Sequence, residues 1–265
     1  MINIKNDKQI EDMRHGGKIL AEVLLEVLKH AKPGVSELEL DKLAEELIIK
    51  KGGEPGFKRV DGYNHTICIS INSVVVHGIP TNYKIKEGDV VGIDCGVLYN
   101  GLNTDMAETI YVKSQKSKVL VKGQSSSGRK SSEIDKFLET GKRALDEGIR
   151  QARVGNRVGH ISKAIQSIVE GEGYSVVESL VGHGVGEDLH EDPEVPGFLS
   201  GDINGTPLLK ENMTIAVEVI YNMGGKDVVY RGDDNWTIST ADNSISGLFE
   251  RTIVITKRGP VFLTN

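Results

Sequence analysis

Apolar side chains recur at helical spacing near the start of the chain and again after its middle. Over residues 7–31 they stand mostly three or four positions apart, which predicts an amphipathic helix. A second helix is expected over 40–48, and Gly52 behind it permits the left-handed backbone that ends many helices. The same order returns later as a helix predicted over 134–152 and a shorter one over 161–169.

Strand patterns fill the stretches between these helices. Alternating or continuous apolar runs predict strands over 65–77, 89–98, 103–112, 213–221 and 247–256. Asn100-Gly101 separates the second of these strands from the third, and this dipeptide is a strong signal for a tight hairpin. The chain is therefore expected to mix helices with antiparallel strands, in an α+β fold.

The two parts of the chain resemble each other weakly. A shift of 121 residues lays Ala31 on Ala152 and Gly34 on Gly155, within a recurring order of helix, glycine turn, helix and strands. We interpret residues 1–265 as a single domain with similar halves at about 1–112 and 133–265. A site between the two halves is the natural place for chemistry.

Composition narrows the class of protein. With 38% hydrophobic and 26% charged residues, the chain is an ordinary globular protein and not a disordered or collagen-like one. Its net charge of -6 argues against a surface that binds nucleic acid or anionic membrane all over. The two cysteines offer no disulfide framework, and the early apolar stretch is interrupted by Glu22 and Glu26, so we expect no membrane span and a cytoplasmic location.

A basic segment joins the two halves. Residues 113–132 hold six lysines and arginines and no acidic residue, around a GQSSSG sequence that is typical of a flexible turn. A solvated loop is the simpler interpretation, and a contact with nucleic acid phosphates, such as those of a ribosome, is the alternative.

The predicted hairpin brings two carboxylates together. If Asn100-Gly101 forms a two-residue turn, Asp94 lies opposite Ala107, and Asp94 and Asp105 become diagonal neighbours on one face. Two carboxylates so close repel each other, and a divalent cation would neutralise them. An exposed acidic hairpin is the alternative, because solvent would then screen the repulsion.

Further polar residues in apolar surroundings extend this candidate site. Glu218 and Glu250 each interrupt an apolar strand, which is costly unless the carboxylate is paired, binds metal or faces water at a sheet edge. His183 lies between two glycines, with His190 seven residues later, and His77 ends an earlier strand. A structural role is the alternative for each histidine, but one imidazole with four carboxylates would suit Mn, Fe, Co or Zn as divalent ions.

At these residues the chain resembles the methionine aminopeptidases of the pita-bread family, in the short form without an added zinc-binding region. The resemblance extends over nearly the whole chain and rests on segments that stand in the family's order: IEDMRHGG, KPGVSELELDKLA, CISINSVVVHGIP, the Asp94–Asp105 hairpin, GHGVGEDLHEDPEVP and the strands of Glu218 and Glu250. It implies two pseudo-symmetric halves with a curved antiparallel sheet covered by helices.

The resemblance also implies roles for single residues. Two divalent ions would be bound by Asp94, Asp105, His183, Glu218 and Glu250, with Asp105 and Glu250 as bridging ligands. Glu218 would move the proton of the attacking water, and His190 and His77 would contact the substrate carbonyl and the scissile nitrogen. The methionine pocket would include Tyr63, Cys68 and Trp236, although a core role is equally open for the only tryptophan.

Substrates implied in this way are peptides and nascent polypeptides with amino-terminal methionine, and the protein is expected to be a monomer. Two alternatives stay open. One is an Xaa-Pro aminopeptidase or dipeptidase of the same fold, although Ser179 stands where those enzymes have an extra histidine. The other is a non-catalytic protein of this fold that binds a ribosome or RNA through residues 113–132.

Overall fold

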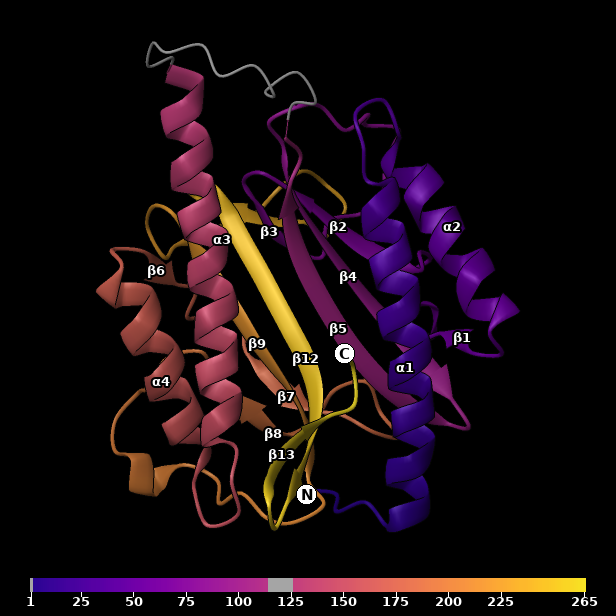
Figure 1. Cartoon of the computed structure of the whole chain (residues 1–265), viewed down its shortest axis with the longest axis vertical. Helices are drawn as coiled ribbons and strands as arrows, with labels where there is room; N and C mark the ends of the chain where they lie inside the picture. Colours follow the sequence, from indigo (N-terminus) through magenta and orange to yellow (C-terminus); the bar gives the residue numbers. More distant parts are fainter. Residues whose placement is uncertain (1, 114–125) are drawn as a thin grey trace.

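The computed structural model describes residues 2–113 and 126–265, in which helices lie against antiparallel strands (Figure 1). The helices are α1 (Asp7–His30), α2 (Glu37–Lys50), α3 (Ser126–Gln151) and α4 (Val158–Gly171), with short 3-10 helices η1 (Phe57–Arg59) and η2 (Ile203–Gly205). The strands are β1 (Glu54–Pro55), β2 (Ile67–Ile71), β3 (Val74–Val76), β4 (Val90–Tyr99), β5 (Leu102–Tyr111), β6 (Ser175–Val176), β7 (Gly182–Gly184), β8 (Glu191–Val195), β9 (Thr214–Asn222), β10 (Val228–Tyr230), β11 (Ile238–Thr240), β12 (Ser246–Thr256) and β13 (Gly259–Phe262). This mixture confirms the predicted α+β class.

The main sheet joins strands from distant parts of the chain. Its order is β1-β4-β5-β12-β9-β7-β8, with β2 beside β4, β6 beside β9 and β13 beside β12. Strands β10, β11 and β3 form a second, small sheet. Strand β5 therefore lies next to β12, although well over a hundred residues separate them along the chain.

Each predicted helix forms where its local sequence favours it. Asn6 caps α1 and exchanges hydrogen bonds with Gln9, and Ser36 caps α2 in the same way with Glu39, so each capping box satisfies two backbone amides at the start of its helix. Behind α2, Gly52 has a φ of 83°, which is the left-handed conformation predicted there.

Two boundaries differ from the sequence prediction. The strand expected over 65–77 is divided into β2 and β3, because Asn72 adopts a positive φ of 55° and turns the backbone. Helix α3 begins at Ser126 and not near residue 134, so the end of the GQSSSG sequence is helical and not part of a turn. The rest of the predicted basic segment, residues 114–125, lies outside the described residues.

The hairpin of β4 and β5 has the predicted register. Tyr99 pairs with Leu102 and Asp94 with Ala107, and Asn100 and Gly101 have φ values of 50° and 78°. Positive φ at both central residues is the type I′ turn that suits the twist of a two-residue hairpin. The two aspartates therefore share one face of the sheet, as expected.

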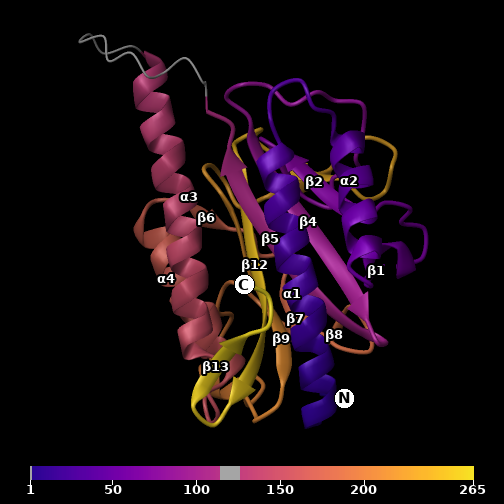
Figure 2. The ribbon, with the colours of Figure 1, turned by 45° about the vertical axis from the view of Figure 1, so that its right-hand side comes forward.

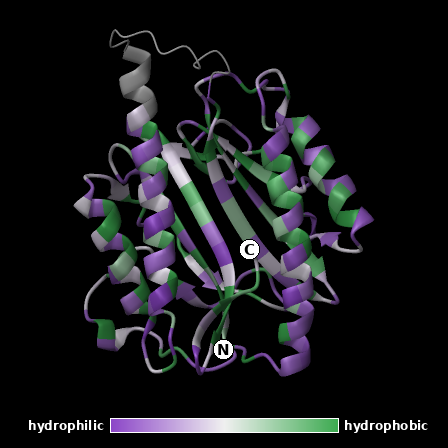
Figure 3. Cartoon of the chain, viewed as in Figure 1, coloured by the Kyte–Doolittle hydropathy of each residue, from purple (hydrophilic) through white to green (hydrophobic). Residues whose placement is uncertain are grey.

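Two buried apolar clusters pack between helices and sheet, one on each side of the β5–β12 pair. Helices α1 and α2 pack with β2, β4 and β5 in the first cluster, and α3 and α4 pack with β9 and β12 in the second. Figures 1 and 2 show this arrangement, and Figure 3 shows apolar residues along the strands and polar ones along the outer faces of the helices. Within the described part of the chain, every helix is too short or too polar to cross a bilayer.

Candidate metal centre

Four carboxylates come together where the two sets of strands meet. Asp94 pairs with Ala107, Ala107 with Glu250, and Glu250 with Glu218, so these positions form one row across β4, β5, β12 and β9. Asp105 stands two residues from Ala107 and therefore points to the same face. The sequence predicted that Asp94 and Asp105 lie close together, and the strand order of the sheet places the other two candidate acids, Glu218 and Glu250, directly beside them.

Both glutamates lie inside the sheet and not at an edge. Strand β12 has β5 and β9 as neighbours, and β9 has β12 and β7. This strand order excludes the edge-strand alternative for both glutamates. The exposed fraction is 3% for Glu250 and 3% for Asp105, so Asp105 is not part of a solvated acidic hairpin. Buried carboxylates without a compensating partner are costly, so this arrangement calls for one.

His183 completes the cluster from the neighbouring strand. It pairs with Ala216 across β7 and β9, two positions from Glu218 and on the same face. Its Nδ1 lies 2.9 Å from the Gly184 carbonyl, to which it donates, and this leaves the Nε2 lone pair free. That Nε2 faces Glu250 Oε1 at 3.9 Å, so two acceptor atoms point at each other with room between them.

Burial dominates the electrostatics of the centre. It raises the pKa of Asp105 to about 7, assisted by the charge of Glu218, and that of Glu218 to about 8, assisted by Asp94. The pKa values of Asp94 and Glu250 are raised well above the usual range for the same reasons. Burial and the neighbouring His190 lower the pKa of His183 to about 4, so its imidazole is neutral.

A divalent cation fits these donors. Asp94 Oδ1 and Glu250 Oε1 are buried without a hydrogen-bond partner. Donor atoms of Asp105, His183 and Glu250 all lie within 4.8 Å of one another, which is close to the spacing of ligands that bind one ion at about 2.1 Å. Asp94 and Glu218 lie outside that tight group but line the same cavity. Carboxylate oxygens with one neutral imidazole nitrogen suit first-row divalent ions.

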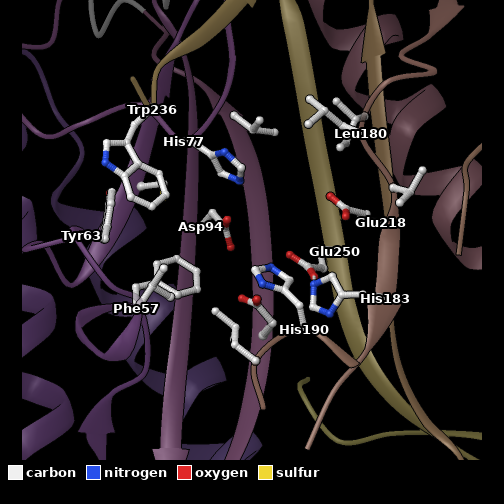
Figure 4. A pocket seen from close by; sticks show the side chains of 17 residues that line it. Phe57, Tyr63, His77, Asp94, Leu180, His183, His190, Glu218, Trp236 and Glu250 are labelled. Carbon is white, nitrogen blue, oxygen red and sulfur yellow. Dashed lines mark ion pairs between the residues drawn. The ribbon is translucent and has the colours of Figure 1, made fainter. Parts of the chain in front are cut away.

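The carboxylates line a cavity of about 170 Å³ together with apolar side chains (Figure 4). Trp236, Tyr63 and Phe57 form one wall of this pocket, with Cys68 packed against them. The rings of Tyr63 and Trp236 meet edge to face with centroids 5.1 Å apart. The three predicted pocket residues therefore do line one cavity, and Trp236 is not simply part of the core.

The two other predicted histidines also face this cavity. His77 lies at the end of β3 with its ring centroid 6.3 Å from that of Trp236, and burial lowers its pKa to about 4. The ring of His190 packs edge to face on His183 with centroids 4.4 Å apart. Figure 4 shows His77 above Asp94 and His190 beside His183 and Glu250, so both imidazoles reach the space next to the carboxylates.

Polar contacts behind the pocket hold these residues in place. Asp41 of α2 accepts hydrogen bonds from the Thr66 and Ile67 amides at 2.7 and 3.1 Å, and Tyr63 donates to the Ile67 carbonyl at 2.8 Å. The segment that carries the pocket wall is thus fixed to α2.

The loop of His190 is held in a different way. Lys5 forms a buried ion pair with Glu191, the residue after His190, and the Lys5 amide donates to the Asn212 carbonyl at 3.0 Å. Glu191 also accepts from the Asp188 amide at 3.3 Å. Residues near the start of the chain therefore hold the loop that presents this histidine.

Sequence reasoning missed part of the lining. Seven apolar residues also line the cavity and were not among the predicted site residues: Phe57, Val60, Val76, Leu180, Val181, Leu189 and Ile220. Ile220 stands two positions after Glu218 in one strand, so alternation alone indicated that it shares the face. Phe57 had no such signal. A side chain at Gly96 would meet the Phe57 ring at 2.8 Å, so the absence of a side chain at this glycine leaves room for the pocket wall.

Comparison with known proteins agrees with this geometry. Residues 11–257 match the model of metallopeptidase family M24. The chain belongs to this family. It is 42% identical over 264 residues to a methionine aminopeptidase of Clostridium perfringens, covering 100% of this chain and 99% of that protein. It is 41% identical to methionine aminopeptidase 1 of Bacillus subtilis, again over 100% of this chain and 99% of the relative.

Solved structures of the family have the same fold. The methionine aminopeptidase of Thermotoga maritima superposes with a TM-score of 0.89 at 36% identity, with all of both chains covered. The prolidase of Pyrococcus furiosus gives 0.74 at 23% identity over 99% of this chain and 65% of its own, which shows the shared fold alone. The predicted pita-bread fold and the resemblance to methionine aminopeptidases are confirmed.

Removal of metal should make stability depend on pH. Because folding raises the pKa of Asp105 to about 7 and of Glu218 to about 8, the metal-free folded state binds more protons than the unfolded state. Its stability should therefore fall as pH rises from 6.5 to 8.5, by about 1.4 kcal/mol per pH unit for each excess proton. Folding lowers the pKa values of His183 and His77 to about 4, so these histidines change the stability only at lower pH.

Thermal unfolding of chelator-treated protein across this pH range measures the effect. Added Mn²⁺ should raise the melting temperature most at pH 8.5, where the carboxylates are ionised. A melting temperature of the metal-free protein that stays constant or rises between pH 6.5 and 8.5 would contradict the electrostatics described.

Proposed function

We propose that the protein removes amino-terminal methionine from peptides and nascent polypeptides by metal-dependent hydrolysis. The observation that carries this proposal is that candidate metal ligands and an aromatic side-chain pocket line the same cavity. A cluster of carboxylates and histidines, of which Asp105, His183 and Glu250 are buried, shares one cavity with aromatic and thiol side chains. Relatives about 40% identical over the whole chain are methionine aminopeptidases, which supports the same activity here.

Two divalent ions, of cobalt, manganese, iron or zinc, would be held by the five ligands. Asp94 would bind one ion, Asp105 and Glu250 would bridge both, and His183 with Glu218 would complete the other. When bound, such a pair lowers the pKa of a water molecule and so supplies a nucleophile at neutral pH.

The residues of the chain perform the remaining steps. Glu218, which lines the cavity, accepts the proton of the attacking water and returns it to the leaving amine. His190 donates a hydrogen bond to the oxygen of the scissile carbonyl, where negative charge develops. His77 faces the scissile nitrogen from the other side of the cavity. The ring of His77 lies against Trp236 and that of His190 against His183, which helps to orient both imidazoles.

The methionine side chain would occupy the aromatic pocket. Tyr63 and Trp236 present ring faces and edges, and Cys68 adds a buried thiol. A thioether is polarizable and packs well against aromatic edges, with favourable contacts of about 0.3–1.5 kcal/mol. The whole cavity, including the space beside the carboxylates, measures about 170 Å³, so the aromatic pocket is smaller than this.

Other parts of the proposal concern partners. The ribosome contact through 113–132 stays a prediction, because residues 114–125 lie outside the described residues. A monomeric state and a cytoplasmic location are likewise predictions that oligomer analysis and cell fractionation would test.

A substrate panel tests the proposed activity. The full chain loaded with Mn²⁺ or Co²⁺ should release methionine from Met-Ala-Ser, since its side chain fills the aromatic pocket and places the first peptide bond at the carboxylates. A peptide that begins with Ala-Pro should release its first residue at least about 100-fold more slowly, because its side chain leaves that pocket empty.

Release is quantified by amino acid analysis under identical metal conditions. Chelator-treated protein is the matched control and should be inactive on both peptides. Hydrolysis of the Ala-Pro peptide without methionine release from Met-Ala-Ser would favour the Xaa-Pro peptidase alternative. No hydrolysis of either peptide by metal-loaded protein would favour the non-catalytic one.

A further inference from the structure

The two sets of strands are joined by a short ladder. Strand β5 pairs with β12 only at Ala107–Glu250 and Met106–Arg251, whereas β4 and β5 pair from Val90 to Tyr99, over the whole of β4. The two proposed bridging ligands come from the two strands of this short ladder, Asp105 from β5 and Glu250 from β12. Whatever holds β5 against β12 therefore also sets the distance between these carboxylates.

Beside Thr252, the chain that follows β13 occupies the edge of β12. The Leu263 amide donates to the Thr252 carbonyl at 2.9 Å, and the Thr252 amide donates to the Thr264 hydroxyl at 3.0 Å. Figure 1 shows this carboxyl-terminal end lying near β5 and α1. The backbone groups of Thr252 are thus already paired and unavailable to β5, which ends the ladder just before Asp105.

The side chain of Thr252, in place of its backbone, forms the hydrogen bonds to β5 at this point. Its hydroxyl accepts a hydrogen bond from the Asp105 amide at 2.8 Å and donates one to the Asp105 carbonyl at 2.8 Å. Thr252 is completely buried, and Asp105 is only 3% exposed. Buried backbone amides and carbonyls need partners, so one hydroxyl satisfies both groups of the proposed ligand.

We propose that Thr252 is a positioning residue that fixes the backbone of Asp105 and thereby aims its carboxylate at Glu250 and His183. The carboxylate has little freedom of its own, since Asp105 Oδ1 accepts from the Met106 amide at 3.0 Å. Rotation of the Asp105 backbone would therefore carry the carboxylate away from the other donors. This inference rests on the proposed function, because it concerns the affinity of the metal centre.

The molecule contains a matched control for this role. At the other side of the Ala107–Glu250 pair, the Thr109 hydroxyl donates to the Leu248 carbonyl at 2.6 Å and accepts from the Leu248 amide at 3.0 Å. Thr109 is 1% exposed and makes the same two bonds across the same strands. Leu248 is not a proposed ligand, so Thr109 stabilises the strand pair without holding a carboxylate.

Calorimetric titration of the metal-free full chain with Mn²⁺ separates the two threonines. Thr252→Val keeps the shape but loses the hydroxyl, and should weaken Mn²⁺ binding about 10–100-fold, as loss of an outer-shell partner does. Thr109→Val should lower the melting temperature of the metal-free protein by about as much as Thr252→Val does, because each variant loses the same two hydrogen bonds. It should, however, keep the affinity for Mn²⁺ within about threefold of that of the wild type. Thr252→Ser restores the hydroxyl and should bind Mn²⁺ like the wild type.

Each outcome decides the matter. Wild-type affinity in Thr252→Val, or equal weakening in Thr252→Val and Thr109→Val, would overturn the proposal. If Thr252→Val does not fold, Thr252→Cys replaces it, because a thiol of similar size is a weaker donor and acceptor. Absence of Mn²⁺ binding by the wild type would instead contradict the proposed metal centre, so the two failures are distinguishable.

Discussion

Replacement of Asp105 by asparagine is expected to abolish methionine release while making the metal-free protein more stable. Asp105→Asn removes one of four clustered carboxylates, whose ionisation is disfavoured by desolvation and then by their mutual repulsion, and it should weaken the metal centre because Asp105 is a proposed bridging ligand. Activity should fall at least about 10³-fold, beyond the 10-fold to 100-fold range of outer-shell changes. The metal-free melting temperature should rise by about 2–4 °C for each kcal/mol of relieved repulsion.

The two readouts are methionine release with Mn²⁺ and thermal unfolding after chelation. Asp135→Asn is the matched control, since Asp135 is exposed and pairs only with Lys113 among the contacts described for it. It should change neither readout beyond error. An Asp105→Asn variant that keeps more than a tenth of wild-type activity would exclude Asp105 as a bridging ligand.

Glu218→Gln is expected to lower kcat about 10²–10⁴-fold with little change in KM, because an amide cannot accept the proton of the attacking water. The side chain keeps one oxygen and nearly the same shape, so the aromatic pocket on the far side of the cavity is undisturbed (Figure 4). Steady-state kinetics on Met-Ala-Ser at saturating Mn²⁺ measure both constants.

Metal content must be compared in the same samples, because Glu218 is also a proposed ligand. Glu211→Gln is the control, since that glutamate is 42% exposed and paired with Lys257. A Glu218→Gln variant with full metal content and kcat within threefold of the wild type would contradict the role in proton transfer. Reduced kcat that recovers fully at higher Mn²⁺ would assign Glu218 to metal binding alone.

The sequence predicted which residues belong to the site better than it predicted which strands bring them together. A two-residue turn at Asn100 fixes the register of β4 and β5 over the whole hairpin, so the diagonal relation of Asp94 and Asp105 followed from local rules. The glutamates were different. Nothing local indicates that Glu218 lies opposite Glu250, because that pairing depends on which strands become neighbours in the sheet.

Boundaries were least predictable where one residue overrides a longer pattern. The apolar run from β2 to β3 continues across Asn72, and only the positive φ of that residue separates the strands. The contact of Phe57 with Gly96 and the bonds of Thr252 to Asp105 join segments remote in sequence. Such contacts depend on tertiary packing and cannot be predicted from composition or periodicity.

The ion pair of Lys5 with Glu191 has a consequence for the order in which the molecule can assemble during synthesis. Lys5 leaves the ribosome long before Glu191 and Asn212, which hold its side chain and its backbone. Glu250 follows later still. Contacts between such distant residues form slowly and only once both segments exist. A chain still in translation therefore lacks a fixed histidine loop until Glu191 and Asn212 have been added, and a complete ligand set until Glu250 has been added.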